Sequence, residues 1–188
     1  MKKFAYIVSR IFDPVVEIPL ILLVATWYAL TNGLRFRFLI FLVVFDVLLP
    51  ALYLVWGLIT KRISDWDMTK RSERSGIYLF VVFVHAISVV YAYFLGKTDL
   101  AAILFVFWML AVIFTLITRF WKISIHAGVN GVILAYFNHV WGWEHYWWSV
   151  LILLLILWAR VEAKKHTWSQ VVVGAALSIT WVEIGLRL

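Results

Sequence analysis

The sequence predicts an all-α protein, a polytopic transmembrane bundle of six to seven helices, and three observations lead to this fold class. Of the 188 residues, 65% are hydrophobic and 14% are charged, whereas soluble domains are about 45 to 50% apolar and about 25% charged. The apolar residues form long runs separated by polar segments, and a helix needs about 20 apolar residues to cross a bilayer core. The runs are continuous and do not alternate as barrel strands do, so the spans are expected to be helices.

Seven runs are candidate spans. Five are long and two are shorter and rich in aromatic residues: 15 to 31, 38 to 60, 77 to 95, 100 to 118 and 167 to 186, then 127 to 140 and 146 to 159. Glu17 and Pro19 in the first run leave open whether it crosses the membrane or lies in the interface. The run lacks a small-residue cleavage site, so we expect it to be retained. The length allows one domain, and we expect residues 1–188 to form a single integral-membrane domain.

The charge pattern predicts which way the protein faces. Lys and Arg number 17 against 10 Asp and Glu, a net charge of +7, which in a membrane protein reports topology and anionic lipid ligands and not nucleic acid. Seven passes put the N-terminus and the loops near 61–76, 119–126 and 160–166 on one side. That side holds every Lys and Arg except Arg35, Arg37, Lys97 and Arg187, so thirteen cations face four. The positive-inside rule makes this side cytoplasmic, in a multi-pass protein of the cell membrane.

Several kinds of site are excluded or disfavoured. The chain has no cysteine, which excludes disulfides, thiol chemistry and Cys-ligated metals. His139 and His145 lie beside Glu144 in a stretch crowded with aromatic residues, namely Trp141, Trp143, Tyr146, Trp147 and Trp148. This stretch is typical of an aromatic belt at the membrane interface. We expect neither a metal nor a cofactor.

The polar residues that remain lie in three segments on the predicted cytoplasmic side, at 64–76, 121–128 and 159–174. They supply five cations, a hydroxyl and two imidazoles: Lys70, Arg71, Arg74, Lys122, Arg160, Ser124, His126 and His166. Guanidinium forks and ammonium groups suit the oxygens of a phosphate. Of two imidazoles, one can attack phosphorus while the other protonates the leaving oxygen. Basic residues also collect at helix ends for topology alone, which is the interpretation we prefer for Lys61, Arg62, Lys164 and Lys165.

These residues resemble the type-2 phosphatidic acid phosphatase superfamily of integral-membrane lipid phosphatases, whose pattern is KxxxxxxRP, PSGH and SRxxxxxHxxxD. The resemblance covers about residues 60 to 180, with the motifs in the family's order. The third motif matches best, through Arg160 and His166. The second keeps Ser124 and His126 and loses its proline and glycine. In the first motif Arg74 is kept, but Asp67 stands where a lysine is expected, so Lys70, Arg71 or Lys122 would replace that charge.

The last family position also differs, because Gln170 stands where an aspartate is expected. Spacing of four residues on a helix still puts Gln170 on the face of His166. An amide oxygen can accept the ring proton and orient the imidazole, but it cannot neutralise an imidazolium, so slower turnover is expected.

The resemblance implies a metal-independent hydrolase acting on a phosphatidate-like or polyprenyl (di)phosphate through a phosphohistidine intermediate. His166 would be the nucleophile and His126 the acid, while Arg74, Arg160, Ser124 and one of the three lysine or arginine replacements hold the phosphate. Gln170 would orient His166. The expected partners are a lipid phosphate and the bilayer, without nucleic acid; the sequence does not predict an oligomeric state.

Two other functions stay open. The departures from the motifs also fit a catalytically degraded relative that binds or transports phospholipid. Asp65 and Asp67 form a pair that could hold Mg2+ against a diphosphate, or could balance neighbouring cations and cap a helix. Asp46 and His85 fall inside predicted spans. An ionisable group there indicates a functional site, but a polar pair between helices explains the same observation and is the interpretation we prefer.

Overall fold

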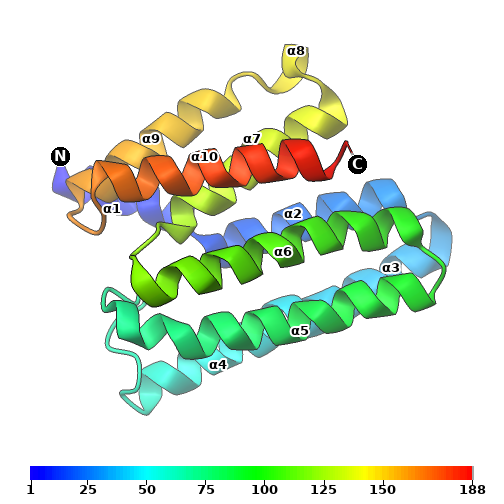
Figure 1. Cartoon of the computed structure of the whole chain (residues 1–188), viewed down its shortest axis with the longest axis horizontal. Coiled ribbons are helices and arrows are strands. Elements are labelled where there is room, and N and C mark those ends of the chain that lie inside the picture. Colours follow the sequence, from blue (N-terminus) through cyan, green and yellow to red (C-terminus); the bar gives the residue numbers. More distant parts are fainter. Residues whose placement is uncertain (188) are drawn as a thin grey trace. The chain divides into compact units, whose positions relative to one another are not determined.

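The computed structural model describes residues 1 to 187, and every regular element in that part of the chain is helical (Figure 1). The elements are α1 (Lys2–Ile11), α2 (Pro14–Ala29), α3 (Asn32–Leu42), the π-helix η1 (Val43–Leu48), α4 (Leu49–Ile59), the 3-10 helix η2 (Arg71–Glu73), α5 (Arg74–Phe94), α6 (Thr98–Phe120), α7 (Ile125–Trp141), α8 (Trp143–Tyr146), α9 (Ser149–Glu162) and α10 (Trp168–Gly185). The all-α prediction is confirmed. The chain forms two compact units: unit 1 is Met1–Glu17 with Lys122–Leu188, and unit 2 is Ile18–Trp121.

Unit 2 contains the three helices that are long and apolar enough to cross a membrane. They are Gly33–Ile59, which runs through α3, η1 and α4, then Arg71–Phe94 and Thr98–Phe120. α5 and α6 form an antiparallel hairpin (Figure 1). Large apolar side chains such as Leu52, Phe83 and Leu116 are more than half exposed. A soluble protein rarely exposes apolar surface on this scale, so these helices are suited to lipid, which supports the prediction of a membrane protein.

The other four predicted spans are also helices, but they are shorter than the three helices of unit 2. α2 has 16 residues, α7 has 17, α9 has 14 and α10 has 18. At 1.5 Å per residue they reach about 21 to 27 Å, against a bilayer core of about 30 Å. Six to seven crossings therefore remain a prediction.

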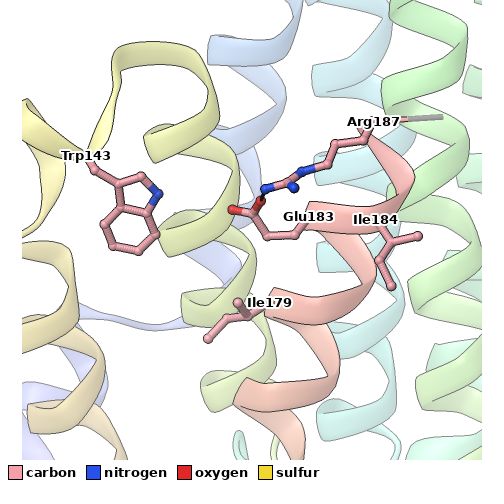
Figure 2. A pocket seen from close by; sticks show the side chains of 5 residues that line it. All are labelled: Trp143, Ile179, Glu183, Ile184 and Arg187. Carbon is pink, nitrogen blue, oxygen red and sulfur yellow. Dashed lines mark hydrogen bonds and ion pairs between the residues drawn. The ribbon is translucent and has the colours of Figure 1, made fainter.

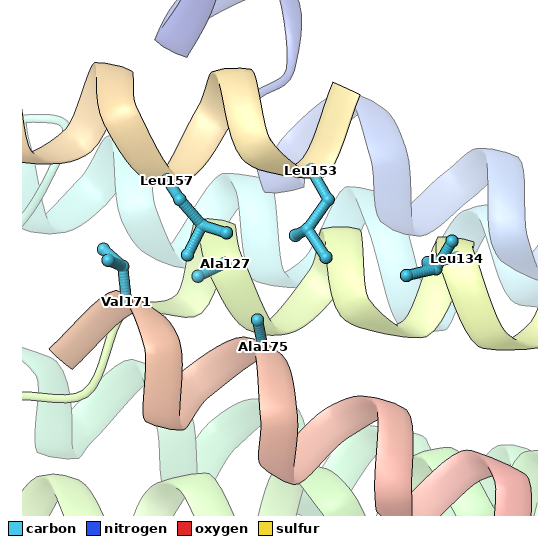
Figure 3. Close-up of a cluster of buried hydrophobic side chains, with 6 residues drawn as sticks. All are labelled: Ala127, Leu134, Leu153, Leu157, Val171 and Ala175. Carbon is cyan, nitrogen blue, oxygen red and sulfur yellow. The ribbon is translucent and has the colours of Figure 1, made fainter. Parts of the chain in front are cut away.

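The core of unit 1 lies between α7, α9 and α10 (Figure 3). It consists of six buried side chains: Ala127, Leu134, Leu153, Leu157, Val171 and Ala175. Glycines let α7 and α10 approach closely, because a Cβ on Gly131 would stand 2.8 Å from the carbonyl oxygen of Ala175. One on Gly174 would be equally close to the carbonyl oxygen of Ser124. Small residues at such contacts are typical of helix packing in membranes.

The N-terminal helix α1, which the sequence did not predict, belongs to the same unit. Ala5 and Val8 pack with Ile156 and Ala159 of α9 in a second buried cluster. The spacing of three from Ala5 to Val8 puts both side chains on one face of α1. α1 thereby anchors the chain that leads into residues 13 to 17, which become important at the site.

Candidate functional site

Six of the nine residues that the sequence predicts for the site lie in unit 1, where α7 and α10 begin and α9 ends. The backbone N–H of Ser124 donates to the carbonyl of Gln170 at 3.3 Å, which joins the beginnings of α7 and α10. The Lys122 ammonium donates to the carbonyl of Lys165 at 2.9 Å. The carbonyl of Arg160 accepts from the backbone N–H of His166 at 3.3 Å. Backbone and side-chain bonds therefore hold Lys122, Ser124, His126, Arg160, His166 and Gln170 at one end of three packed helices.

The orientation of His166 follows from its bond to Gln170. The Oε1 atom of Gln170 lies 3.1 Å from Nδ1 of His166 and accepts the backbone N–H of Thr167 at 3.2 Å. A backbone N–H can only donate, so the amide atom that it reaches is the oxygen. The same oxygen then requires the proton of His166 to be on Nδ1, which leaves the lone pair of the neutral ring on Nε2. The contact between Gln170 and His166 is the one that the sequence predicts for an orienting residue, while a catalytic role of either side chain stays a prediction.

Gln170 also begins α10. The hydroxyl of Thr167 accepts the backbone N–H of Gln170, and the Gln170 side chain accepts that of Thr167, which together form a capping box. The nucleophile candidate therefore sits immediately before a well-capped helix, and one side chain performs both tasks.

Two further features favour an anion at this end of unit 1. α7 and α10 both begin there, and helix N-termini attract negative charge through their dipoles and N–H groups. Ser124 caps α7 by accepting the N–H of Ala127 at 3.4 Å, so its own hydroxyl proton can be donated elsewhere. Arg160 is 2% exposed, and a buried guanidinium needs anionic or polar company.

The structure adds acidic residues that the sequence prediction missed. Asp13, directly before α2, and His126 are both buried, with Oδ2 of Asp13 lying 3.9 Å from Nε2 of His126. Oδ2 also accepts from Nη1 of Arg10 at 2.9 Å. One turn further along each helix, the Asn130 amide donates to Oε2 of Glu17 at 2.8 Å and to the carbonyl of His126 at 3.0 Å. The repeated spacing of four residues, in Asp13 and Glu17 and in His126 and Asn130, is a signal that could have found this pairing.

The three predicted phosphate ligands of unit 2 have local partners. Arg74, 2% exposed, donates from Nε to the carbonyl of Met68 at 2.9 Å and from Nη2 to that of Asp67 at 3.4 Å. Arg71 donates to the carbonyls of Thr118 and Arg119 at the end of α6. Lys70 is exposed and forms an ion pair with Glu73 at 3.4 Å. Arg71 therefore caps the C-terminus of α6 through these two carbonyls. A cation that served only to orient the protein in the membrane would not need such bonds.

Asp65 organises the loop that carries Asp67 and Met68. Its carboxylate accepts the backbone N–H groups of Asp67 at 3.0 Å and of Thr69 at 3.2 Å, and the hydroxyl of Thr69 at 3.0 Å. Met68 stands at φ 46°, in the left-handed region. Bonds of this kind are typical of a side chain that folds a turn. No cluster of three or more metal-ligating side chains is present within residues 1–187.

Asp46 and His85 meet inside unit 2, so they form a polar pair between helices. Asp46 lies in η1, where one carboxylate oxygen contacts Nδ1 of His85 and the other accepts the hydroxyl of Ser88. Nε2 of His85 faces the carbonyl of Leu104 in α6 at 3.2 Å. The network ties η1 to α5 and α6, and π-helical turns often accompany such local constraints.

The opposite end of α7 and α10 is interfacial in character. A pocket of about 390 Å3 is lined there by Trp143, Ile179, Glu183, Ile184 and Arg187 (Figure 2). Glu183 and Arg187, one turn apart at the end of α10, form an ion pair at 2.8 Å on the pocket wall, and Trp141 stacks on Tyr146. His145 and Glu144 are exposed, 3.6 Å apart. This pocket lies at the end of α10 opposite to the candidate site, and the aromatic belt stays a prediction.

Comparison with known proteins gives no assignment: no protein-family model matches the chain, and no curated protein or solved structure matches it significantly.

Proposed function

We propose that the protein is a lipid phosphatase of the histidine-nucleophile type, related to the type-2 phosphatidic acid phosphatases. The observation that carries the proposal is the Gln170 oxygen 3.1 Å from Nδ1 of His166, which assigns the lone pair to Nε2. Two helix N-termini, Ser124 and the buried Arg160 are gathered in the same unit. Such a set suits a phosphate that gains negative charge on its equatorial oxygens during transfer.

In the proposed reaction Nε2 of His166 attacks phosphorus and a P–N bond forms. The P–O bond to the leaving oxygen breaks, its electron pair stays on that oxygen, and His126 supplies the proton. Water then attacks the phosphohistidine, and His126 takes one of its protons. Ser124, Arg160 and Arg74 hold the phosphate together with one of three further cations: Lys70, Arg71 or Lys122. No step requires a metal or a cofactor.

The proposal places this chemistry in a multi-pass protein of the cell membrane with six to seven crossings and a cytoplasmic site. A substrate with an acyl or prenyl chain would keep that chain in lipid while its phosphate meets residues at helix ends. The exposed apolar surface of the helices supports such an arrangement. The substrate class is a phosphatidate-like or polyprenyl (di)phosphate.

The deciding experiment measures phosphate release by purified protein in detergent from phosphatidate and short polyprenyl diphosphates, with and without EDTA. We expect chelator-resistant release that His166→Ala abolishes and that His145→Ala, a matched change at an exposed imidazole, leaves intact. Brief incubation with 32P-labelled substrate should trap an acid-labile, base-stable phosphoenzyme in the wild type and in His145→Ala, but not in His166→Ala. EDTA-sensitive release would favour a magnesium site at Asp65 and Asp67 instead.

A second function is favoured by one observation. Gln170 brings an uncharged amide to the nucleophile, so the site suits phosphate binding even if turnover is lost. A catalytically degraded relative would bind or transport phospholipid. No release across the lipid panel, together with saturable binding of a phosphatidate-containing vesicle that Arg160→Ala weakens, would establish that alternative.

A further inference from the structure

We propose that Asp13 is a positioning residue that holds the His126 ring in place and stabilises its protonated form, so that His126 can act as the acid. This inference rests on the proposed function. It assigns a role in the reaction to the chain between α1 and α2, a segment outside the motifs that carry the resemblance.

The first argument is geometric. Oδ2 of Asp13 lies 3.9 Å from Nε2 of His126, and both side chains are buried, with exposures of 6% and 5%. An opposite charge within about 4 to 6 Å favours the charged form of an ionisable group. Contacts of catalytic groups are often long before the substrate binds and tighten in the complex. A carboxylate at this separation is therefore placed to stabilise an imidazolium.

The second argument is that Asp13 is itself held in place. Its Oδ1 accepts the backbone N–H of Val15 at 3.1 Å, and its carbonyl accepts that of Glu17 at 3.0 Å. Nη1 of Arg10 donates to Oδ2 at 2.9 Å. These bonds fix the carboxylate at the beginning of α2. Arg10, Asp13 and His126 thus form a chain of alternating charge once the imidazole is protonated.

The third argument is that the register between α2 and α7 is set twice. Glu17 accepts the Asn130 amide at 2.8 Å, four residues beyond Asp13 and His126 on the respective helices. The same amide donates to the carbonyl of His126. Because this second contact fixes the register, Asp13 meets His126 and not a neighbouring residue of α7.

The different partners of the two imidazoles explain why one acts as the nucleophile and the other as the acid. A nucleophile must be neutral when it attacks, and His166 is bonded to the neutral amide of Gln170. An acid must be protonated, and His126 is next to a carboxylate. Environments that separate the protonation states of two like groups in this way assign the acid and the base.

The test compares two substrates that differ in the leaving group, octyl phosphate and 4-nitrophenyl phosphate. The alkoxide needs a proton to depart and the nitrophenolate does not. We expect Asp13→Asn to lower kcat/KM for octyl phosphate by about 10- to 100-fold, within the range of general acid catalysis, and to change that for 4-nitrophenyl phosphate by less than about threefold. His126→Ala should give the same selective loss. Equal losses on both substrates would make Asp13 merely structural and overturn the inference.

The matched control is Glu17→Gln, which removes a buried carboxylate one turn away and can still accept the Asn130 amide. It should keep the wild-type ratio between the substrates. Asp13→Glu, which retains the charge, should recover part of the loss on octyl phosphate.

A readout independent of activity separates this inference from the proposed function. Carbon-13 labelling of histidine reports the protonated fraction of His126 at pH 7, which we expect to fall at least severalfold in Asp13→Asn and to stay unchanged in Glu17→Gln. If the wild type releases no phosphate but this change is seen, the proposed function fails and the pairing stands. If His126 shows the same protonation in both variants and the wild type, the pairing is wrong.

Discussion

At the scale of single residues, Gln170 combines a structural and a chemical role that different substitutions separate. Glutamate at this position keeps the capping box, because Glu and Gln serve equally at its third helical position. Alanine removes the acceptor of the Thr167 N–H. We expect Gln170→Ala to lower stability by about 1 kcal/mol and Gln170→Glu to leave it unchanged. Thermal unfolding in detergent measures both.

The same pair of variants tests the chemistry of His166. A carboxylate at Nδ1 stabilises the positive charge that the ring acquires when Nε2 bonds to phosphorus, which the amide cannot do. Gln170→Glu should therefore raise turnover up to about tenfold, the equivalent of about 1.4 kcal/mol, while Gln170→Ala lowers it. A glutamate variant slower than the wild type would show that the amide is the better partner.

Arg71 and Lys70 are adjacent cations with different surroundings, which predicts different effects of alanine. Arg71 donates to two carbonyls at the end of α6 and faces the negative end of its dipole, which contributes roughly 0.3 to 1 kcal/mol for an exposed cation. Lys70 makes an exposed ion pair, which contributes little. We expect Arg71→Ala to lower Tm by about 2 to 4 °C and Lys70→Ala to leave it within error. Equal shifts would contradict the cap on α6.

At the scale of elements, the close contact of α7 with α10 depends on glycine. A Cβ at Gly174 would meet the carbonyl oxygen of Ser124 at 2.8 Å, and backbone cannot move aside as a side chain does. Gly174→Ala should therefore cost about 1 to 3 kcal/mol through overpacking, and it should loosen the Ser124–Gln170 bond at the site.

A glycine on another helix supplies the control, with an effect of opposite sign. A Cβ at Gly33 in α3 meets nothing within 4 Å, so Gly33→Ala should stabilise by about 0.5 to 1 kcal/mol through helix propensity. Reversible unfolding in detergent measures both changes. If Gly174→Ala were neutral, the helices would have room to separate without loss, and glycine would not set their distance.

These elements show how far sequence patterns reach. Apolar runs predicted α2, α4, α5, α6, α7, α9 and α10 and the second half of α3, because continuous apolarity is a property of each segment alone. They missed α1, whose apolar face is narrow and whose burial depends on α9. They also did not predict the π-helical turn of η1, where Asp46 contacts His85 and Ser88 on α5. The sequence of one segment does not reveal its contacts with another segment.

The candidate site was likewise predicted only in part from the sequence. The motif spacing predicted that Lys122, Ser124, Arg160 and His166 belong together, and packing of α7, α9 and α10 brings them to one end of unit 1. Asp13 was missed because 113 residues separate it from His126, and only the fold joins them. Whether Arg74 shares the phosphate with these residues stays a prediction.

At the scale of the whole molecule, the charge count predicts sidedness, and the absence of cysteine makes the prediction simple to test. Lys97 lies in the turn between α5 and α6, and Lys164 in the loop between α9 and α10. Seven crossings place them on opposite sides of the membrane, with Lys164 on the cation-rich side. Replacing either lysine by cysteine changes the ratio of thirteen to four by one charge, too little to reverse it.

We therefore expect a membrane-impermeant maleimide to label Lys97→Cys in intact cells and Lys164→Cys only after permeabilisation. A cysteine at Lys164 is adjacent in sequence to Lys165, whose carbonyl accepts Lys122, so its label also reports where the candidate site faces. Labelling of Lys164→Cys from outside would move the site to the outer face, because its residues would follow the α9–α10 loop. The thirteen cations would then have to be explained as ligands for anionic lipid and not as determinants of topology. Labelling of both positions from the same side would instead indicate an even number of crossings between them, which would leave one of α7 and α9 in the interface.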